Sequence, residues 1–298
     1  KSDKDKIHDR LLKLQQSHSN YISPLDLEIS TYLKPPIVKI IIIIIYQYIL
    51  GSKTPTDNNY FIFTKDKYIS LSKYAINSYK NQFKTYFLNI RYKKLTKEID
   101  LNEKYLYFPL QLYFENSQQP GCFPFSNILW TLKQILKKLP SDIILVVKEH
   151  PAQLNGKTQS NIRQHRTSSL YQAISRLDRV KLVDINADTV TLIENSLGVI
   201  AGSGSVAFEA IVRNKPILYY GDHVLSNLEE LYSFKRSEEA NLFFEVISGN
   251  SIPSNRSLEL ISDDMSNNIY YADSFGDYQK DSVAISENLI EIIQQGET

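Results

Sequence analysis

Two short polar motifs in the second half of this chain each follow a buried apolar run. Lys148-Glu149-His150-Pro151 comes directly after Ile143–Val147, and Gly202-Ser203-Gly204-Ser205 comes directly after Leu197–Ala201. Ligands of open α/β sheets bind beyond the carboxyl ends of the strands, where helix N-termini offer free N–H groups to anions. The two motifs therefore predict one site for a phosphorylated ligand.

His150 stands where the first of these strands must end, because Pro151 cannot continue it. A histidine in that place can donate a hydrogen bond to a phosphate oxygen and, when protonated, offset the charge of a departing phosphate. Glu149 beside it can accept hydrogen bonds from ribose hydroxyls or from a base. The alternative is a structural histidine bonded to a loop carbonyl, and the residue types alone leave both readings open.

The glycine/serine motif predicts a tight turn that opens a helix. Gly202 and Gly204 allow a ligand close to the backbone, and Ser203 and Ser205 supply hydroxyl donors. An ordinary strand-to-helix turn with a serine N-cap has the same pattern. The motif is neither a P-loop nor a Gly-x-Gly-x-x-Gly fingerprint. Glu209, near the first turn of the helix, is either a ribose-binding group or a surface carboxylate.

Strands and helices are predicted to alternate from Lys104 onward, and the arrangement of these elements determines where the two motifs lie. Such alternation predicts a parallel, doubly wound sheet, so the carboxyl ends of its strands share one edge. Gln111 and Glu115, which follow the first strand, could face the same cleft. The expected strands are 105–108, 143–147, 180–183, 197–201 and 217–220; the expected helices are 127–139, 168–176, 188–195, 205–212 and 283–293.

The first 104 residues are harder to interpret, and we expect them to form a separate, shorter N-terminal region. Helical patterns occur at Ile7–Gln16 and Tyr68–Leu95, and Tyr60–Phe63 is typical of a short strand. The apolar run Ile37–Leu50 is too short for a membrane-spanning helix, so it predicts a buried strand or helix, with a membrane-surface segment as the alternative. The chain begins without Met or a signal-peptide pattern, which is consistent with a trimmed N-terminal domain.

Charge is unevenly distributed, although the net formal charge is only +1. Residues 1–104 hold 18 Lys and Arg against 10 Asp and Glu, whereas the remainder is acidic. A basic half suits an anionic acceptor or a membrane surface, and a solvated lysine-rich face is the alternative. The single Cys122 excludes a disulfide framework, and we expect neither a metal site nor a nucleic-acid partner.

The order of the motifs resembles the bacterial capsule polysaccharide biosynthesis family, which includes β-Kdo glycosyltransferases with a GT-B fold. The resemblance covers roughly residues 104–222. It rests on Tyr-Phe-Pro-Leu-Gln at 107–111, Lys-Glu-His-Pro at 148–151, Gly-Ser-Gly-Ser-Val-Ala-Phe-Glu-Ala at 202–210 and Asn-Lys-Pro at 214–216. One departure is that the family reads Gln-Pro-Glu after its first strand, whereas here three residues separate Gln111 from Glu115.

The resemblance implies a GT-B-like α/β fold, with an N-terminal acceptor-side region at 1–104 and a Rossmann-type nucleotide-sugar domain at 105–298. It further implies a CMP-activated sugar, with Kdo as the expected sugar, bound without a metal or other cofactor. His150 would contact the phosphate, with Ser203, Gly204 and Ser205 around it. Glu149 and Glu209 would face the nucleotide, as would Gln111 and Glu115. The general base stays unassigned.

The expected protein is then a cytoplasmic glycosyltransferase, or one bound peripherally at the inner membrane, that acts on a surface glycan or glycolipid. Three alternatives share the same C-terminal site. They are a CDP-alditol phosphotransferase, an NDP-sugar epimerase, and a nucleotide-binding module without catalysis.

Overall fold

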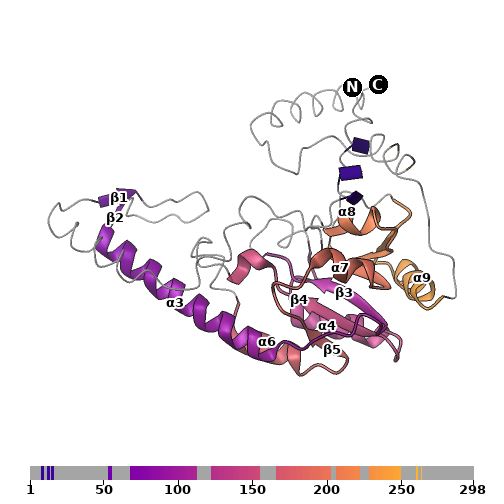
Figure 1. Ribbon diagram of the computed structural model, residues 1–298, viewed down its shortest axis with the longest axis horizontal. Helices are drawn as coiled ribbons and strands as arrows, with labels where there is room; N and C mark the ends of the chain where they lie inside the picture. The colour runs from indigo at the N-terminus through magenta and orange to yellow at the C-terminus, as the bar shows by residue number, and fades with distance from the viewer. Residues whose placement is uncertain are drawn as a thin grey trace.

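The computed structural model describes residues 83–112, 122–154, 166–202, 206–221 and 228–249, the backbone of 53–55 and 68–82, and isolated positions near both ends. A six-stranded sheet dominates this part (Figure 1). Its strands are β3 (Tyr105–Pro109), β4 (Ile144–Lys148), β5 (Val180–Leu182), β6 (Gly198–Ala201), β7 (Ile217–Tyr219) and β8 (Leu231–Ser233).

All five strand pairings in this sheet are parallel, and the strand order is β5-β4-β3-β6-β7-β8. The chain therefore runs outward from β3 to β5, returns to place β6 against the other side of β3, and then runs outward in the opposite direction. This reversal makes the β3/β6 boundary the topological switch point, where open α/β sheets bind ligands. The α/β class and the Rossmann-type parallel sheet predicted for the C-terminal region are confirmed.

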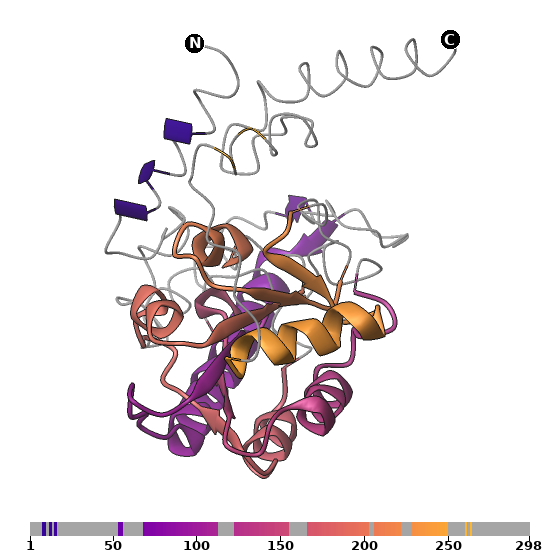
Figure 2. The same cartoon turned by 90° about the vertical axis from the view of Figure 1, so that its right-hand side faces the viewer.

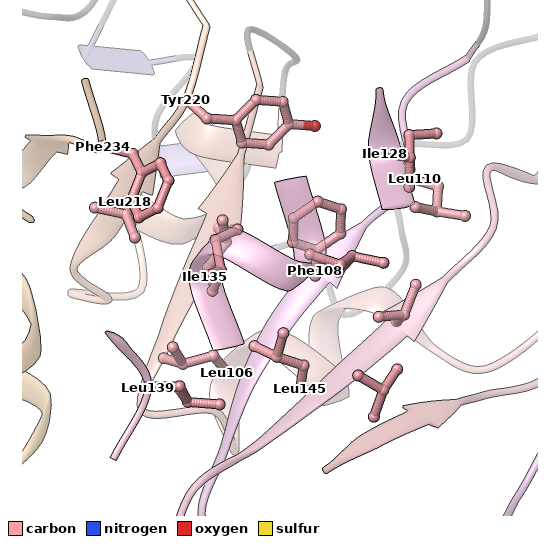
Figure 3. Close-up of a cluster of buried hydrophobic side chains, with 14 of the residues drawn as sticks. Leu106, Phe108, Leu110, Ile128, Ile135, Leu139, Leu145, Leu218, Tyr220 and Phe234 are labelled. Atoms are coloured by element: carbon pink, nitrogen blue, oxygen red, sulfur yellow. The ribbon is translucent and has the colours of Figure 1, made fainter. Parts of the chain in front are cut away.

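Helices cover both faces of the sheet, as buried parallel strands require (Figure 2). One face packs against α4 (Ile128–Lys138), α6 (Ser168–Ser175) and α9 (Ser237–Ile247); the other packs against α7 (Thr189–Glu194) and α8 (Val206–Ile211). Figure 3 shows the first core, in which Leu106 and Phe108 of β3 lie near Ile135 of α4. The rings of Phe108 and Tyr220 are stacked with centroids 5.7 Å apart.

Local sequence signals account for several helix ends. The side chain of Asn127 caps α4 by accepting from the Trp130 N–H, and Asp188 caps α7 by accepting from the Thr191 N–H. Both residues stand at the first position of a helix range that the sequence predicted, 127–139 and 188–195. Thr167 caps α6 in the same way through the Leu170 N–H, one residue before the predicted start.

The long helix α3 (Leu71–Leu95) starts later than its periodicity suggested. Tyr68–Ser70 instead forms strand β2, which pairs in antiparallel register with β1 (Lys53–Pro55). The C-terminal half of α3 packs on the domain beside α6, with Tyr92 fully buried. The division into regions 1–104 and 105–298 stays a prediction, although the sheet does begin at Tyr105.

Two elements of the domain had no clear sequence signal, namely β8 and α9. β8 has only three residues, and α9 begins without a side-chain hydrogen bond at its cap residue, Arg236. Other expectations lie outside the described residues: the Ile37–Leu50 run, the Tyr60–Phe63 strand, most of Ile7–Gln16 and the Val283–Ile293 helix.

Candidate functional site at the switch point

The carboxyl ends of β3 and β6 meet through Gln111 and Gly202. A side chain at Gly202 would place its Cβ 2.3 Å from the Gln111 amide oxygen, so the amide lies directly against the Gly202 backbone. Cys122 Sγ lies 3.6 Å from the same oxygen. The sequence predicted that these two strand ends face one cleft, and the structure brings them into contact. A larger residue at Gly202 would therefore require the Gln111 amide, the end of a flexible side chain, to move away.

Replacing Gly202 with alanine is expected to lower the free energy of unfolding by about 1–3 kcal/mol, because the new methyl group overpacks a buried contact. Urea denaturation measures this cost. The same substitution in a Gln111→Ala background should cost clearly less, because the clashing amide is then gone. Equal costs in the two backgrounds would show that the Gln111 amide does not press on Gly202.

Glu149 is fully buried, and its carboxylate is held from several sides. Oε2 accepts hydrogen bonds from Arg166 Nε at 2.7 Å and from Tyr171 Oη at 2.6 Å. Oε1 accepts from the His150 N–H at 2.8 Å. This differs from the expected ribose-facing carboxylate: buried charges need partners, and here those partners come from the protein itself.

Arg166 joins the carboxyl ends of β3 and β4. In addition to its ion pair with Glu149, its Nη2 donates to the Gln111 carbonyl oxygen at 2.7 Å. Tyr171 on α6 adds its hydroxyl to the same carboxylate. Tyr92 on α3 accepts from the Glu149 N–H at 3.0 Å and donates to the Val183 carbonyl at 2.7 Å. The loop before α6 and two helices thus fix the residue that precedes His150.

Sequence reasoning missed Arg166, Tyr171 and Tyr92 as members of the site. Arg166 lies in a connection without periodic pattern, and the two tyrosines read only as apolar positions of amphipathic helices. An arginine shortly before a predicted helix, paired with a carboxylate at the end of a predicted buried strand, is the one signal that could have suggested the pair.

His150 follows the end of β4, near the side chains of Lys148 and Arg166. Burial and the charges of Lys148 and Arg166 lower the pKa of His150 to about 4, so its imidazole is neutral near pH 7. The same charges would favour an anion next to the ring, and a bound phosphate would raise the pKa of His150 again. Without a ligand the surroundings of His150 disfavour its protonated form, whereas the same charges would favour the binding of an anion.

Lys148 lies on the opposite face of the sheet from Glu149, because side chains alternate along a strand. Glu209 belongs to α8, which packs on that same face. Lys148 Nζ donates to the Ala187 carbonyl at 2.6 Å and to Thr189 Oγ1 at 2.7 Å, at the start of α7. Its ammonium group therefore ties the end of β4 to α7.

Glu209 stands in the first turn of α8, which follows the glycine/serine motif in the sequence. Its Oε2 is buried and has no hydrogen-bond partner among the described residues. Burial is the main cause that raises the pKa of Glu209, and Arg213 and Lys148 oppose the shift. A buried carboxylate oxygen without a donor is costly, so a ligand hydroxyl there would satisfy it.

The remaining predicted site residues fall outside the described residues, namely Glu115 and the turn Ser203, Gly204 and Ser205. Within the described ranges, no group of three or more His, Cys, Asp or Glu side chains is placed to hold a metal ion. Independence from metal stays a prediction. The helices of the described part include none that is long and apolar enough to cross a membrane.

Comparison with known proteins supplies a family match. Residues 45–228, more than half of the chain, match the family model described as capsule polysaccharide biosynthesis protein. No curated protein matches the chain.

Two solved structures are similar at low identity. The β-Kdo 2,7 transferase KpsC from Thermosulfurimonas dismutans is 17% identical, with 64% of this chain and 61% of that chain covered and a TM-score of 0.34. The UDP-GlcNAc 2-epimerase from Methanocaldococcus jannaschii is 14% identical, with 64% and 54% covered and a TM-score of 0.38. The chain spans less than two thirds of either protein, and likeness at this level assigns it no activity.

Proposed function

Because the chain belongs to the capsule polysaccharide biosynthesis protein family, we propose that it forms the donor-binding part of a glycosyltransferase for a surface polysaccharide. The proposed donor is a CMP-activated sugar, with Kdo as the sugar, and the acceptor is a glycan or glycolipid. The proposed reaction needs no metal, and its place is the cytoplasm or the cytoplasmic face of the inner membrane.

The observation that carries the proposal is the charge environment of His150 at the carboxyl end of β4, the strand next to β3. The charges of Lys148 and Arg166 contribute to the lowered pKa of His150, and the same charges would attract an anion beside the ring, with part of the Arg166 charge offset by Glu149. A nucleotide phosphate is an anion of the right kind for this edge of an α/β sheet. The buried Oε2 of Glu209, which has no hydrogen-bond partner among the described residues, adds a proposed acceptor for a ribose hydroxyl.

In the proposed reaction an acceptor hydroxyl attacks the anomeric carbon of the sugar. The bond between that carbon and the phosphate oxygen breaks, and CMP leaves with the bonding electron pair. His150 donates a hydrogen bond to the leaving phosphate, and the turn Ser203–Ser205 adds donors around it. A carboxylate that is still unassigned takes the proton of the acceptor hydroxyl.

Glu149 takes a different part in this proposal from the one the resemblance implied. Its bonds to Arg166, Tyr171 and the His150 N–H make it a positioning residue that orients His150. Gln111, whose amide lies against Gly202 and accepts from the Cys122 thiol, remains a proposed nucleotide contact. Glu115 remains a proposed nucleotide contact.

Calorimetric titration with CMP, CDP and UDP tests the proposal. We expect CMP to bind most tightly, and we expect His150→Ala to weaken its binding by about tenfold to a hundredfold through loss of a hydrogen bond to a charged group. Lys137→Ala, on the exposed side of α4, is the control and should bind like the wild type. Preference for UDP would contradict the proposed donor and favour an epimerase-like ligand, whereas preference for CDP would favour a phosphotransferase.

A further inference from the structure

The exposed side of α3 carries a stripe of aromatic and basic residues. Along the described side chains of this helix, Thr85, Asn89 and Tyr92 are buried against the domain. The other side presents Phe83, Lys84, Phe87, Arg91 and Lys94, all exposed. At 3.6 residues per turn these five positions fall within an arc of roughly 100°. We call them the α3 stripe.

The two phenylalanines of the α3 stripe form an exposed apolar pair. Phe83 is 44% exposed and Phe87 is 45% exposed, and their rings meet edge to face with centroids 4.6 Å apart. Figure 1 shows α3 extending from β2 to the domain, where the helix lies beside α6. Adjacent exposed aromatic rings on a helix surface indicate a contact surface.

The charge of α3 has a single sign. No Asp or Glu occurs between Leu71 and Lys97, whereas Lys or Arg occurs at seven positions of that segment, three of them in the α3 stripe. Lys93 and Lys97 flank the stripe and are also exposed. A surface of this kind attracts an anionic partner over a distance of about 10 Å at moderate salt.

We propose that the α3 stripe docks the protein on a bilayer that contains anionic lipids. Basic side chains gain attraction from anionic headgroups, and phenylalanine rings enter the boundary between headgroups and acyl chains. The combination on one helix face fits this partner better than a nucleic acid, because the exposed phenylalanine pair adds apolar area that phosphates do not need. The inference goes beyond the proposed reaction and does not depend on the sugar donor.

Docking by this stripe would bring the carboxyl end of β4 close to the lipid surface. Tyr92, on the buried side of the same helix, bonds the Glu149 N–H next to His150. Tyr92 lies five residues after Phe87, which is about 8 Å along the helix axis. An acceptor held in the membrane would therefore be near the end of β4.

Vesicle co-sedimentation of the whole 298-residue chain tests the proposal. The probes are phosphatidylcholine vesicles with and without phosphatidylglycerol. We expect binding to the anionic vesicles only, weakened by added salt. Lys84→Glu/Arg91→Glu should reduce the partition coefficient by about tenfold or more. Phe83→Ser/Phe87→Ser should reduce it as well, because the apolar contact is lost.

Matched controls separate this surface from general charge and apolarity. Lys133→Glu/Lys137→Glu makes the same charge change on exposed positions of α4, and Phe123→Ser removes a phenylalanine that is 73% exposed outside α3. Both controls should bind anionic vesicles like the wild type. All changed side chains are exposed, and unchanged circular dichroism and melting temperature confirm that each variant is folded.

Three results would overturn the proposal. The first is equal binding to neutral and anionic vesicles. The second is wild-type binding by both stripe variants. The third is a wild-type protein that is dimeric and does not bind vesicles, together with stripe variants that are monomeric. That result would identify a second copy of the chain as the partner of α3.

Discussion

Replacing Arg166 with leucine is expected to lower the free energy of unfolding by about 3–5 kcal/mol, because it leaves the Glu149 carboxylate buried without its ion-pair partner. The two side chains are almost completely buried, and Arg166 Nε lies 2.7 Å from Glu149 Oε2. The leucine also removes the donor to the Gln111 carbonyl. Urea denaturation followed by circular dichroism measures the loss.

An exposed pair with the same separation provides the control. Arg236 Nη1 lies 2.7 Å from Glu239 Oε1, and the Arg236 side chain is 71% exposed. Arg236→Leu should cost no more than about 1 kcal/mol, because water solvates the remaining carboxylate. If the two substitutions cost the same, burial does not govern the Arg166 pair.

The double variant Arg166→Leu/Glu149→Leu distinguishes a lost attraction from a stranded charge. Removing both charges should recover part of the stability that Arg166→Leu loses, because the double variant has no buried carboxylate that is left without a partner. The free energy of unfolding of the double variant shows how much the ion pair between Arg166 and Glu149 contributes to folding. CMP affinity then reports on positioning, since a folded double variant no longer holds the His150 N–H through Glu149.

Stability is expected to fall as the pH is lowered from about 6.5 to about 4, because His150 titrates differently in the two states. The unfolded chain binds a proton at His150 near pH 6.5, whereas the folded protein binds it only near pH 4, where burial and nearby cations are overcome. Within this window the unfolded state holds more protons, so the free energy of unfolding rises with pH. The whole shift corresponds to roughly 3 kcal/mol.

His150→Asn isolates this contribution, because asparagine does not titrate. Urea denaturation at pH 7 and pH 4.5 should show a larger loss for the wild type than for the variant. Glu209 works in the opposite direction: its pKa is raised by burial, so its contribution falls as the pH rises through the shifted pKa. Glu209→Gln should therefore steepen the net loss on acidification. Equal losses in the wild type and His150→Asn would mean that His150 has an ordinary pKa.

Much of the fold could be predicted from the sequence because its determinants are local. Apolar runs of a few residues gave the buried strands β3, β4 and β6, and Asn127 and Asp188 gave the starts of α4 and α7. Strand–helix alternation then implies a parallel sheet, since each helix carries the chain back so that the next strand runs in the same direction. Short β8 and uncapped α9 carry weak local signals, and they were missed for that reason.

The candidate site was only partly predictable. Strand ends could be placed, so the meeting of the Gln111 and Gly202 segments followed from a parallel sheet with a switch point. The role of Glu149 could not be predicted, because a carboxylate after a strand looks the same whether it faces a ligand or an internal arginine. Which applies depends on burial, and burial is a property of the packed molecule.

The sequence by itself determined an edge where polar motifs follow buried strands, together with the family to which those motifs belong. Only the tertiary structure decided which polar groups at this edge are bonded to the protein itself and which could bond a ligand. It brought Arg166, Tyr171 and Tyr92 around Glu149 from separate elements, and it left Glu209 Oε2 without a partner among the described residues. The physical reason is that a polar group needs a partner from the protein only when folding removes it from water. Which partners are then near it depends on how distant parts of the chain pack together.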